Sequence, residues 1–170
     1  IRQMQTFSPC SAVCIASEEN LISSGHADGK MYLWDPKTGE RVHEFNVHTK
    51  RITSLALSPA LERRHIMTVS QDNTIKIFDI RKLASNESIQ PLHVIGGSIP
   101  KGMGSGAVTL NVGGGSGRSH SYRIASDWAK ACWSPDGVYA ACGFAGGLLF
   151  IWNLNTNTES ALKTSALQLR

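Results

Sequence analysis

The sequence predicts an all-β fold made of three repeated units, each a four-stranded antiparallel sheet. Hydrophobic residues make up 41% of the chain and charged residues only 18%, which supports a packed core and argues against a disordered chain. Three segments share one pattern: a short apolar strand, a polar turn, and a second strand that ends in an aromatic residue followed by Asp or Asn. Their turns carry Asp-Gly, Asp-Asn or Gly-Gly, which tight hairpins require.

The three segments keep the same internal spacing. They are Leu21–Asp35, Ile66–Asp79 and Val138–Asn153. A turn residue stands 6 positions before the aromatic residue in each copy, in the pairs Asp28 and Trp34, Asp72 and Phe78, and Gly146 and Trp152. The first two aromatic positions are 44 residues apart and the next two are 74 apart, which equals one repeat plus an insertion of 30. A period of this length indicates a repeat architecture.

One further strand precedes each segment and another follows it. The preceding strands are Ala12–Ala16, Ile52–Pro59 and Trp128–Pro135, and the following strands are Arg41–Val47, Pro91–Ile95 and Ser160–Ser165. The predicted division is 1–7, the last strand of a preceding unit; 8–48, 49–95 and 122–170, the three units; and 96–121, an insertion rich in Gly and Ser. We expect this insertion to be a mobile loop, because segments of this composition are flexible.

These units resemble the blades of the WD-repeat family, in which a blade has four strands, about 40–45 residues and a Trp-Asp signature. The resemblance implies a WD-repeat β-propeller with three four-stranded antiparallel blades present. A closed propeller typically has about 4–8 blades, so we expect an incomplete or fragmentary propeller. Either the chain is a fragment of a longer propeller, or copies assemble, or another chain supplies the missing blades. Open blade edges are liable to pair with another copy, which predicts self-association.

In that family a side-chain hydrogen-bond network typically stabilises each blade. It joins an Asp of the second turn, a His before the first strand, a Ser or Thr of the second strand, and the Trp, whose buried N–H needs a partner. The resemblance implies that the network residues here are Asp28, Trp34, His48, Ser70, Asp72 and Trp152, with Thr68 as an alternative to Ser70. We expect every copy to be incomplete: the first lacks an upstream His, the second has Phe78 for Trp, and the third has Gly146 for Asp.

Three motif blocks resemble the propeller of the autophagy-related protein 16 family more specifically. They are Ser24–Lys30 with Trp34–Asp35, Thr68–Asp72 with Ile75–Arg81, and Ser126–Lys130 with Trp133–Gly137 and Phe150–Trp152. The resemblance implies consecutive late blades of a non-catalytic scaffold for protein–protein interaction that recruits partners in autophagosome formation. The alternative is a WD-repeat adaptor of another complex, such as a substrate receptor of a ubiquitin ligase or a component of a ribonucleoprotein.

The residue patterns of enzymes are missing from the sequence. It has no nucleophile elbow, no triad signature and no zinc-finger spacing of Cys and His. The Gly-rich insertion lacks the Gly-Lys-Ser or Gly-Lys-Thr of a phosphate loop. We therefore predict a chain that is not an enzyme, with no catalytic residue, no metal ligand and no cofactor.

Charge and cysteine content constrain partners and location. The net charge is only +4 and the basic residues are scattered, so no nucleic-acid partner is expected. The pair Arg63 and Arg64 stands away from the paired-arginine position of a neighbouring phosphoinositide-binding propeller family, so membrane contact is at most indirect. The four cysteines form no Cys-x-x-Cys pair, and we expect free buried thiols, a reducing compartment and a cytoplasmic location.

Other proteins or peptide motifs are the expected partners, bound on the narrow face where the blade-linking loops gather. The candidate contact residues are His48, Lys50, Arg51, Asp72, Asn73 and Asp127. Arg51 and Asp127 occupy the same place in successive blades, just before the first strand. We expect Arg51→Glu to weaken partner binding without unfolding the blade.

Overall fold

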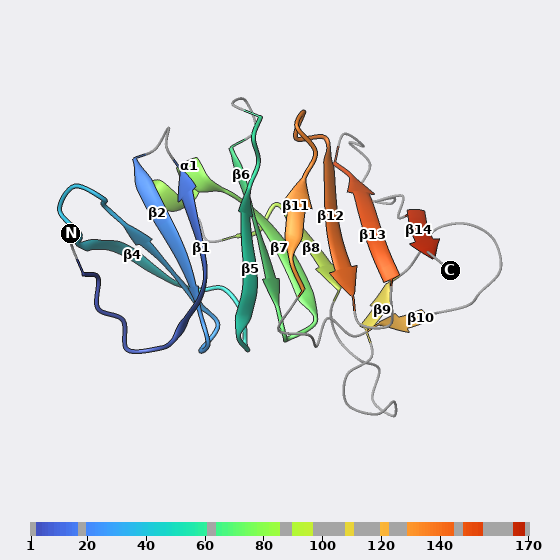
Figure 1. Ribbon diagram of the computed structural model, residues 1–170, viewed down its shortest axis with the longest axis horizontal. Coiled ribbons are helices and arrows are strands. Elements are labelled where there is room, and N and C mark those ends of the chain that lie inside the picture. The colour runs from blue at the N-terminus through green and yellow to red at the C-terminus, as the bar shows by residue number, and fades with distance from the viewer. Residues whose placement is uncertain are drawn as a thin grey trace.

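A computed structural model shows that the strands form three four-stranded antiparallel sheets and one two-stranded antiparallel sheet. The structure describes residues 3–16, 20–60, 64–85, 90–96, 108–110, 120–122, 129–144, 148–154 and 165–168. Each four-stranded sheet joins its strands in chain order, as expected for short hairpin connections (Figure 1).

The strand bounds define the three sheets. The first contains β1 (Cys10–Ala16), β2 (Leu21–His26), β3 (Lys30–Trp34) and β4 (Arg41–Asn46). The second contains β5 (Ile52–Leu57), β6 (His65–Ser70), β7 (Thr74–Asp79) and β8 (His93–Gly96). The third contains β11 (Ala131–Trp133), β12 (Tyr139–Phe144), β13 (Leu148–Asn153) and β14 (Ser165–Gln168). The two-stranded sheet pairs β9 (Val108–Leu110) with β10 (His120–Tyr122).

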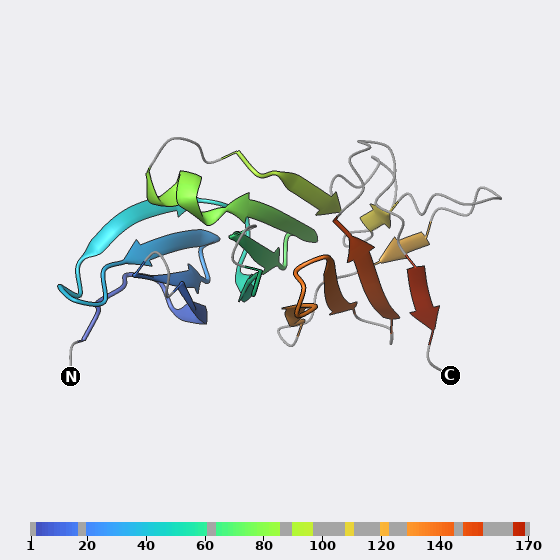
Figure 2. The same cartoon turned by 90° about the horizontal axis from the view of Figure 1, so that it is seen from above.

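The three large sheets lie side by side along the long axis of the molecule, with the two chain ends at opposite ends (Figure 1). Seen from above, they follow one another without closing into a ring (Figure 2). We call them the first, second and third blades. This arrangement confirms the predicted fold class, an all-β incomplete propeller with three antiparallel blades.

Some predicted boundaries differ from the observed strands. Residues 3–7 form no strand, since the other strands of the blade to which we assigned them are not part of this chain. The last strand is described from Ser165 to Gln168 rather than from Ser160 to Ser165. The insertion 96–121 overlaps β9 and most of β10, although we expected a loop, while its remaining residues after Gly96 lie outside the described part of the chain.

The two faces of the second blade pack against different neighbours. Met67, Val69 and Ile77 belong to an apolar cluster shared with the third blade. Ile66 and Phe78 belong to a cluster shared with the first blade. Successive side chains of a strand point to opposite faces, so one strand serves both clusters. Because each of these side chains is at most 2% exposed, each burial contributes about 1.5–3 kcal/mol, and the second blade is stabilised from both sides.

A close backbone approach joins the first two blades. A Cβ atom on Gly25 would lie 2.6 Å from Cγ2 of Ile52, so only glycine lets β2 pack this tightly beside β5. The Ser11 hydroxyl also lies within hydrogen-bond distance of the carbonyls of both Gly25 and Ile52. The interface between the blades is therefore fixed by main chain as well as by apolar side chains.

One helix was not predicted from the sequence. The short α1 (Ile80–Ala84) follows β7, and its N-cap Asp79 accepts a hydrogen bond from the Arg81 N–H. Ile80 and Leu83 are fully buried in the cluster shared with the first blade. The signals were an Asp at an N-cap position and two apolar residues three apart.

The cysteines differ from the expectation of buried thiols. All four are free, but Cys10 and Cys132 are exposed on the edge strands β1 and β11. Burial raises the pKa of Cys14 to about 11 and that of Cys142 to about 12, which keeps both thiols protonated at neutral pH. In the described part of the chain, no helix has the length and apolar character needed to cross a bilayer.

Candidate partner-binding site

The predicted binding face consists of linkers and turns that are connected by backbone hydrogen bonds. The β4–β5 linker (47–51) lies beside the β2–β3 turn (27–29), and the N–H groups of Val47 and His48 both donate to the carbonyl of Gly29. The linker also meets the β6–β7 turn (71–73), whose Gln71 N–H donates to the Arg51 carbonyl at 2.9 Å. We call these segments, with residues 129 and 130 before β11, the loop face.

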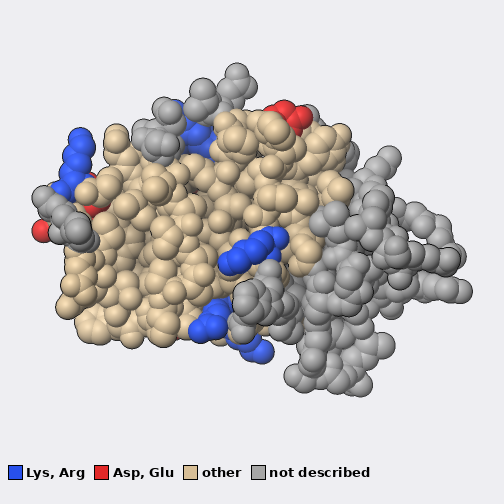
Figure 3. All heavy atoms as spheres, viewed as in Figure 1, with Lys and Arg blue, Asp and Glu red and all other residues tan. Residues whose placement is uncertain are grey.

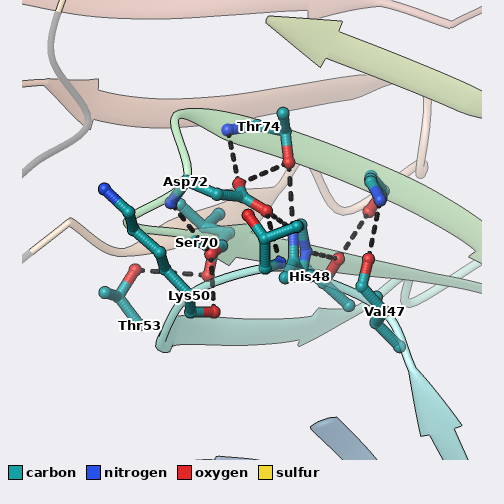
Figure 4. Close-up of polar contacts among 11 residues, drawn as sticks. Val47, His48, Lys50, Thr53, Ser70, Asp72 and Thr74 are labelled. Carbon is teal, nitrogen blue, oxygen red and sulfur yellow. Dashed lines mark hydrogen bonds and ion pairs between the residues drawn. The ribbon is translucent and has the colours of Figure 1, made fainter. Parts of the chain in front are cut away.

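Within the second blade, His48 connects the loop face to the strands (Figure 4). Its Nδ1 lies 2.9 Å from Oδ2 of Asp72, and its Nε2 lies 2.8 Å from the hydroxyl of Thr68 on β6. The Asp72 carboxylate also accepts from the Thr49 N–H and from the hydroxyl of Thr74. The linker, the turn and two strands are thus held through one imidazole.

The structure separates the two alternatives for the β6 residue. Thr68 contacts His48, whereas the Ser70 hydroxyl donates to the Lys50 carbonyl at 3.0 Å and accepts from the Asp72 N–H. Ser70 lies two residues further along β6, level with the linker rather than with the imidazole ring. It therefore fixes the linker and does not belong to the chain of hydrogen bonds through His48.

The pKa directions define the charges of the pair. Burial lowers the pKa of His48, and the hydrogen bond to Asp72 opposes this only in part. Burial alone would raise the pKa of Asp72, but hydrogen bonds from His48, Thr74 and the Thr49 N–H outweigh it and hold this pKa well below its usual range. At neutral pH the pair is a neutral imidazole whose Nδ1–H donates to a carboxylate.

The first blade contains a network that joins the predicted Trp34 to a histidine that we did not predict. The indole N–H of Trp34 donates to the Ser24 hydroxyl at 2.7 Å, and Ser24 lies 2.8 Å from Nε2 of His26. Nδ1 of His26 lies 2.9 Å from the carbonyl of Ser8. The histidine comes from β2 itself, two residues after the serine, instead of from the segment upstream of β1. The buried indole is thereby satisfied and the segment before β1 is fixed to the blade.

Asp28 therefore does not have the role that we assigned to it. It is exposed, and its carboxylate accepts the Lys30 N–H at 3.1 Å within the turn. Since His26 uses its Nδ1 for the Ser8 carbonyl, no imidazole is left for Asp28 to orient. The sequence signal for the alternative network was the Ser-Gly-His run, because residues two apart on a strand share a face.

The other two aromatic positions are buried. Phe78 is 2% exposed and packs in the apolar cluster with the first blade, so it has no polar group that requires a partner. Trp152 is 1% exposed and packs in the cluster with the second blade. Gly146 lies outside the described residues.

Comparison with known proteins identifies the repeats. Residues 2–35 and 39–79 match the family described as WD domain, G-beta repeat. The chain is 33% identical over 157 residues to autophagy-related protein 16 of Arabidopsis thaliana, which covers 92% of this chain and 25% of that protein. It is 31% identical over 155 residues to protein Atg16l2 of Mus musculus, which covers 91% of this chain and 20% of that protein. The chain belongs to the WD-repeat family.

This WD-repeat chain spans a quarter or less of the length of these two relatives. Its fold is also found in the crystal structure of a mitotic checkpoint complex, with a TM-score of 0.59 and 14% sequence identity. That superposition covers 95% of this chain and 38% of the other. At this identity the likeness concerns the fold alone, and it agrees with a partial WD-repeat propeller.

The candidate contact residues of the WD-repeat loop face differ in exposure. Lys50 is exposed and Arg51 is half-buried, whereas only 9% of the Asp72 side chain is exposed. His48 and Asn73 are buried, with 7% and 9% of their surface exposed. Their side chains are therefore not available for broad contact with a partner, and both residues support the loops instead.

Asn73 supports its loop through backbone conformation. It has a φ of +66°, which asparagine tolerates better than most residues, and its N–H donates to the Ser70 carbonyl at 3.2 Å. This closes the β6–β7 turn under the linker. Asp127 lies outside the described residues, so its assignment to the face stays a prediction.

The hydrogen-bond network of the second blade stabilises the fold. A hydroxyl, an imidazole and a carboxylate in line have the arrangement that activates a nucleophile in hydrolases. The hydroxyl here belongs to Thr68, which is 0% exposed and lies between two strands. In the described ranges, no three side chains of His, Cys, Asp or Glu are grouped to hold a metal ion.

Proposed function

We propose that this chain is a non-catalytic docking platform, part of a WD-repeat region like that of autophagy-related protein 16, which recruits protein partners in autophagosome formation. The similarity to that protein over most of the chain supports the autophagy role.

The observation that carries the docking role is the combination of a fixed backbone with exposed side chains on the loop face. The Lys50 carbonyl accepts the Ser70 hydroxyl of β6, and the Arg51 carbonyl accepts the N–H of the β6–β7 turn. At the start of the linker, the N–H groups of residues 47 and 48 donate to the Gly29 carbonyl of the first blade. The Lys50 side chain projects from this frame, away from the buried network (Figure 4). A partner that binds here does not have to order the loop, which favours affinity.

The buried network supports the absence of catalysis in this proposal. The Thr68 hydroxyl is the group that His48 could activate, but it is enclosed by β5 and β7 and contributes to folding. A substrate would reach it only if the blade opened. The same residues are explained fully by their structural contacts.

We expect Arg51→Glu in the full-length protein to reduce recovery of its autophagy partners about fivefold, because reversing a charge at a binding face weakens association. The measurement is quantitative mass spectrometry after affinity purification from starved cells. Lys37→Glu is the matched control, since Lys37 is exposed in the β3–β4 turn at the opposite end of the first blade. Equal recovery from both variants, or recovery only of ubiquitin-ligase or ribonucleoprotein subunits, would contradict the proposed function.

Exposed apolar side chains on β1 favour self-association of this chain. Val13 and Ile15 on β1 are 57% and 67% exposed, and their side chains share one face of an edge strand. We propose that a second copy covers this face in solution, because adjacent exposed apolar side chains mark interaction surfaces. Sedimentation velocity should show a dimer that Ile15→Lys dissociates and that Val94→Lys, a change at an exposed site on β8, leaves intact. A monomer at all concentrations would refute it.

A further inference from the structure

Four basic side chains surround the β4–β5 linker and the start of β5. Lys50 and Arg51 belong to the linker itself. The ammonium group of Lys76 donates to the Val47 carbonyl at 2.6 Å, and that of Lys130 donates to the Thr53 carbonyl at 3.0 Å. Figure 3 shows Lys and Arg side chains gathered at the lower middle of the face, with no acidic side chain beside them among the described residues in this view.

Two described carboxylates lie near this linker: Asp72 in the β6–β7 turn, and Asp28 in the β2–β3 turn, which is exposed and accepts the Lys30 N–H. Asp72 accepts the Thr49 N–H and the imidazole through Oδ2, and the N–H and hydroxyl of Thr74 through Oδ1. The negative charges of Asp72 and Asp28 offset two of the four positive charges. The surroundings of the linker are therefore net positive among the described side chains.

Two of the four charges are fixed in position by the fold. Lys76 reaches the linker from β7, and Lys130 reaches β5 from the segment before β11. The Lys130 contact is reinforced by the Ala131 N–H, which donates to the Ser54 hydroxyl at 3.1 Å. The positive charges thus have a fixed spacing that crosses from the second blade to the third.

We propose that this basic cluster, Lys50, Arg51, Lys76 and Lys130, binds an acidic segment of a protein partner, with Asp or Glu side chains at matching spacing. The proposal rests on the docking function proposed above and specifies the chemistry of the partner. Fixed ammonium groups suit carboxylates on a polypeptide better than the mobile headgroups of a lipid surface. A single-stranded nucleic acid would require exposed rings for base stacking, and linker 47–51, turn 71–73 and residues 129–130 present none.

The test measures fluorescence anisotropy of labelled peptides with the full chain. The probe is a peptide of alternating Glu and Gly, and its comparison is the same peptide with Gln for Glu. We expect the Glu peptide to bind at least tenfold more tightly at low salt, with affinity that falls as salt rises. Lys50→Glu should weaken binding about five- to tenfold, while Lys50→Arg retains it and Lys37→Glu has no effect.

Three outcomes would overturn the inference. They are equal binding of the Glu and Gln peptides, equal binding by Lys50→Glu and Lys37→Glu, or a preference for anionic vesicles or a poly-U oligonucleotide over the Glu peptide. Unchanged thermal unfolding of Lys50→Glu shows that the variant is folded. If the Glu peptide does not bind but Lys50→Glu still recovers fewer partners from cells, the docking function is supported and the proposed acidic partner segment is wrong. If the Glu peptide binds but no autophagy partner depends on Lys50, the proposed function fails and the acidic site stands.

Discussion

Asp72→Ala should lower the free energy of unfolding by about 3 kcal/mol, because it leaves several donors without an acceptor and each buried unsatisfied group costs about 1–3 kcal/mol. The Asp72 side chain is only 9% exposed and the His48 side chain is fully buried. The variant deprives His48, Thr49 and Thr74 of an acceptor, and it releases the linker from the β6–β7 turn. Urea unfolding followed by circular dichroism measures the change.

Asp72→Asn provides the matched control for the charge. The amide has the same shape and its oxygen can still accept one hydrogen bond, so we expect a smaller loss of about 1–2 kcal/mol. If the free energy of unfolding decreases from wild type to Asp72→Asn and again to Asp72→Ala, both the charge and the hydrogen bonds of Asp72 stabilise the blade. Equal stability of all three proteins would contradict the structural role of the network.

The same pair predicts that acid destabilises the fold. His48 and Asp72 both have lowered pKa values in the folded chain, so at acidic pH the unfolded chain binds more protons than the folded chain does. The stabilisation is therefore complete at neutral pH, begins to decline below the ordinary histidine value of 6.5, and declines further below the ordinary aspartate value of 3.8. Below 3.8, Asp72→Ala should lose less stability than the wild type because it lacks the Asp72 titration. Between 6.5 and 3.8 it should lose at least as much, because Asp72 raises the pKa of His48 in the folded chain, and pH-dependent unfolding would measure both effects.

The sheets could be predicted because hairpins leave a local signal. The aromatic residue and the turn residue six positions before it define two paired strands in each copy, and the observed pairs β2–β3, β6–β7 and β12–β13 follow them. Outer strands carry weaker signals, since their ends depend on pairing with a strand already placed. That is why the position of β14 was shifted and the strands β9 and β10 were missed.

The networks were harder to predict because different residues can supply the same hydrogen bond. His26 replaces an upstream histidine by approaching Ser24 from the same strand, which no fixed spacing indicates. Position on the loop face was also a poor guide to exposure. His48 is followed by an exposed residue and Asn73 stands between two half-buried residues, yet His48 points inward to Thr68 and Asn73 closes a turn.

Gly29→Ala is expected to destabilise the chain by about 3 kcal/mol, from two independent effects. Gly29 has a φ of +82°, where a residue with a Cβ costs about 1–2 kcal/mol. The new Cβ would lie 2.3 Å from the His48 carbonyl oxygen and 2.9 Å from that of Lys50, and overpacking against such neighbours costs about 1–3 kcal/mol. Neither atom is the end of a flexible side chain, so the linker itself must move.

Movement of the linker connects this prediction to binding. The Gly29 carbonyl accepts the N–H groups of Val47 and His48, so the turn of the first blade determines where Lys50 projects. Gly29→Ala should therefore weaken binding of the acidic peptide as well as lower stability, although Gly29 has no charge to contribute. Gly143→Ala is the control, because a Cβ there would meet nothing within 4 Å. If Gly29→Ala has the same free energy of unfolding as Gly143→Ala and the same affinity for the peptide as the wild type, the first blade does not position the linker.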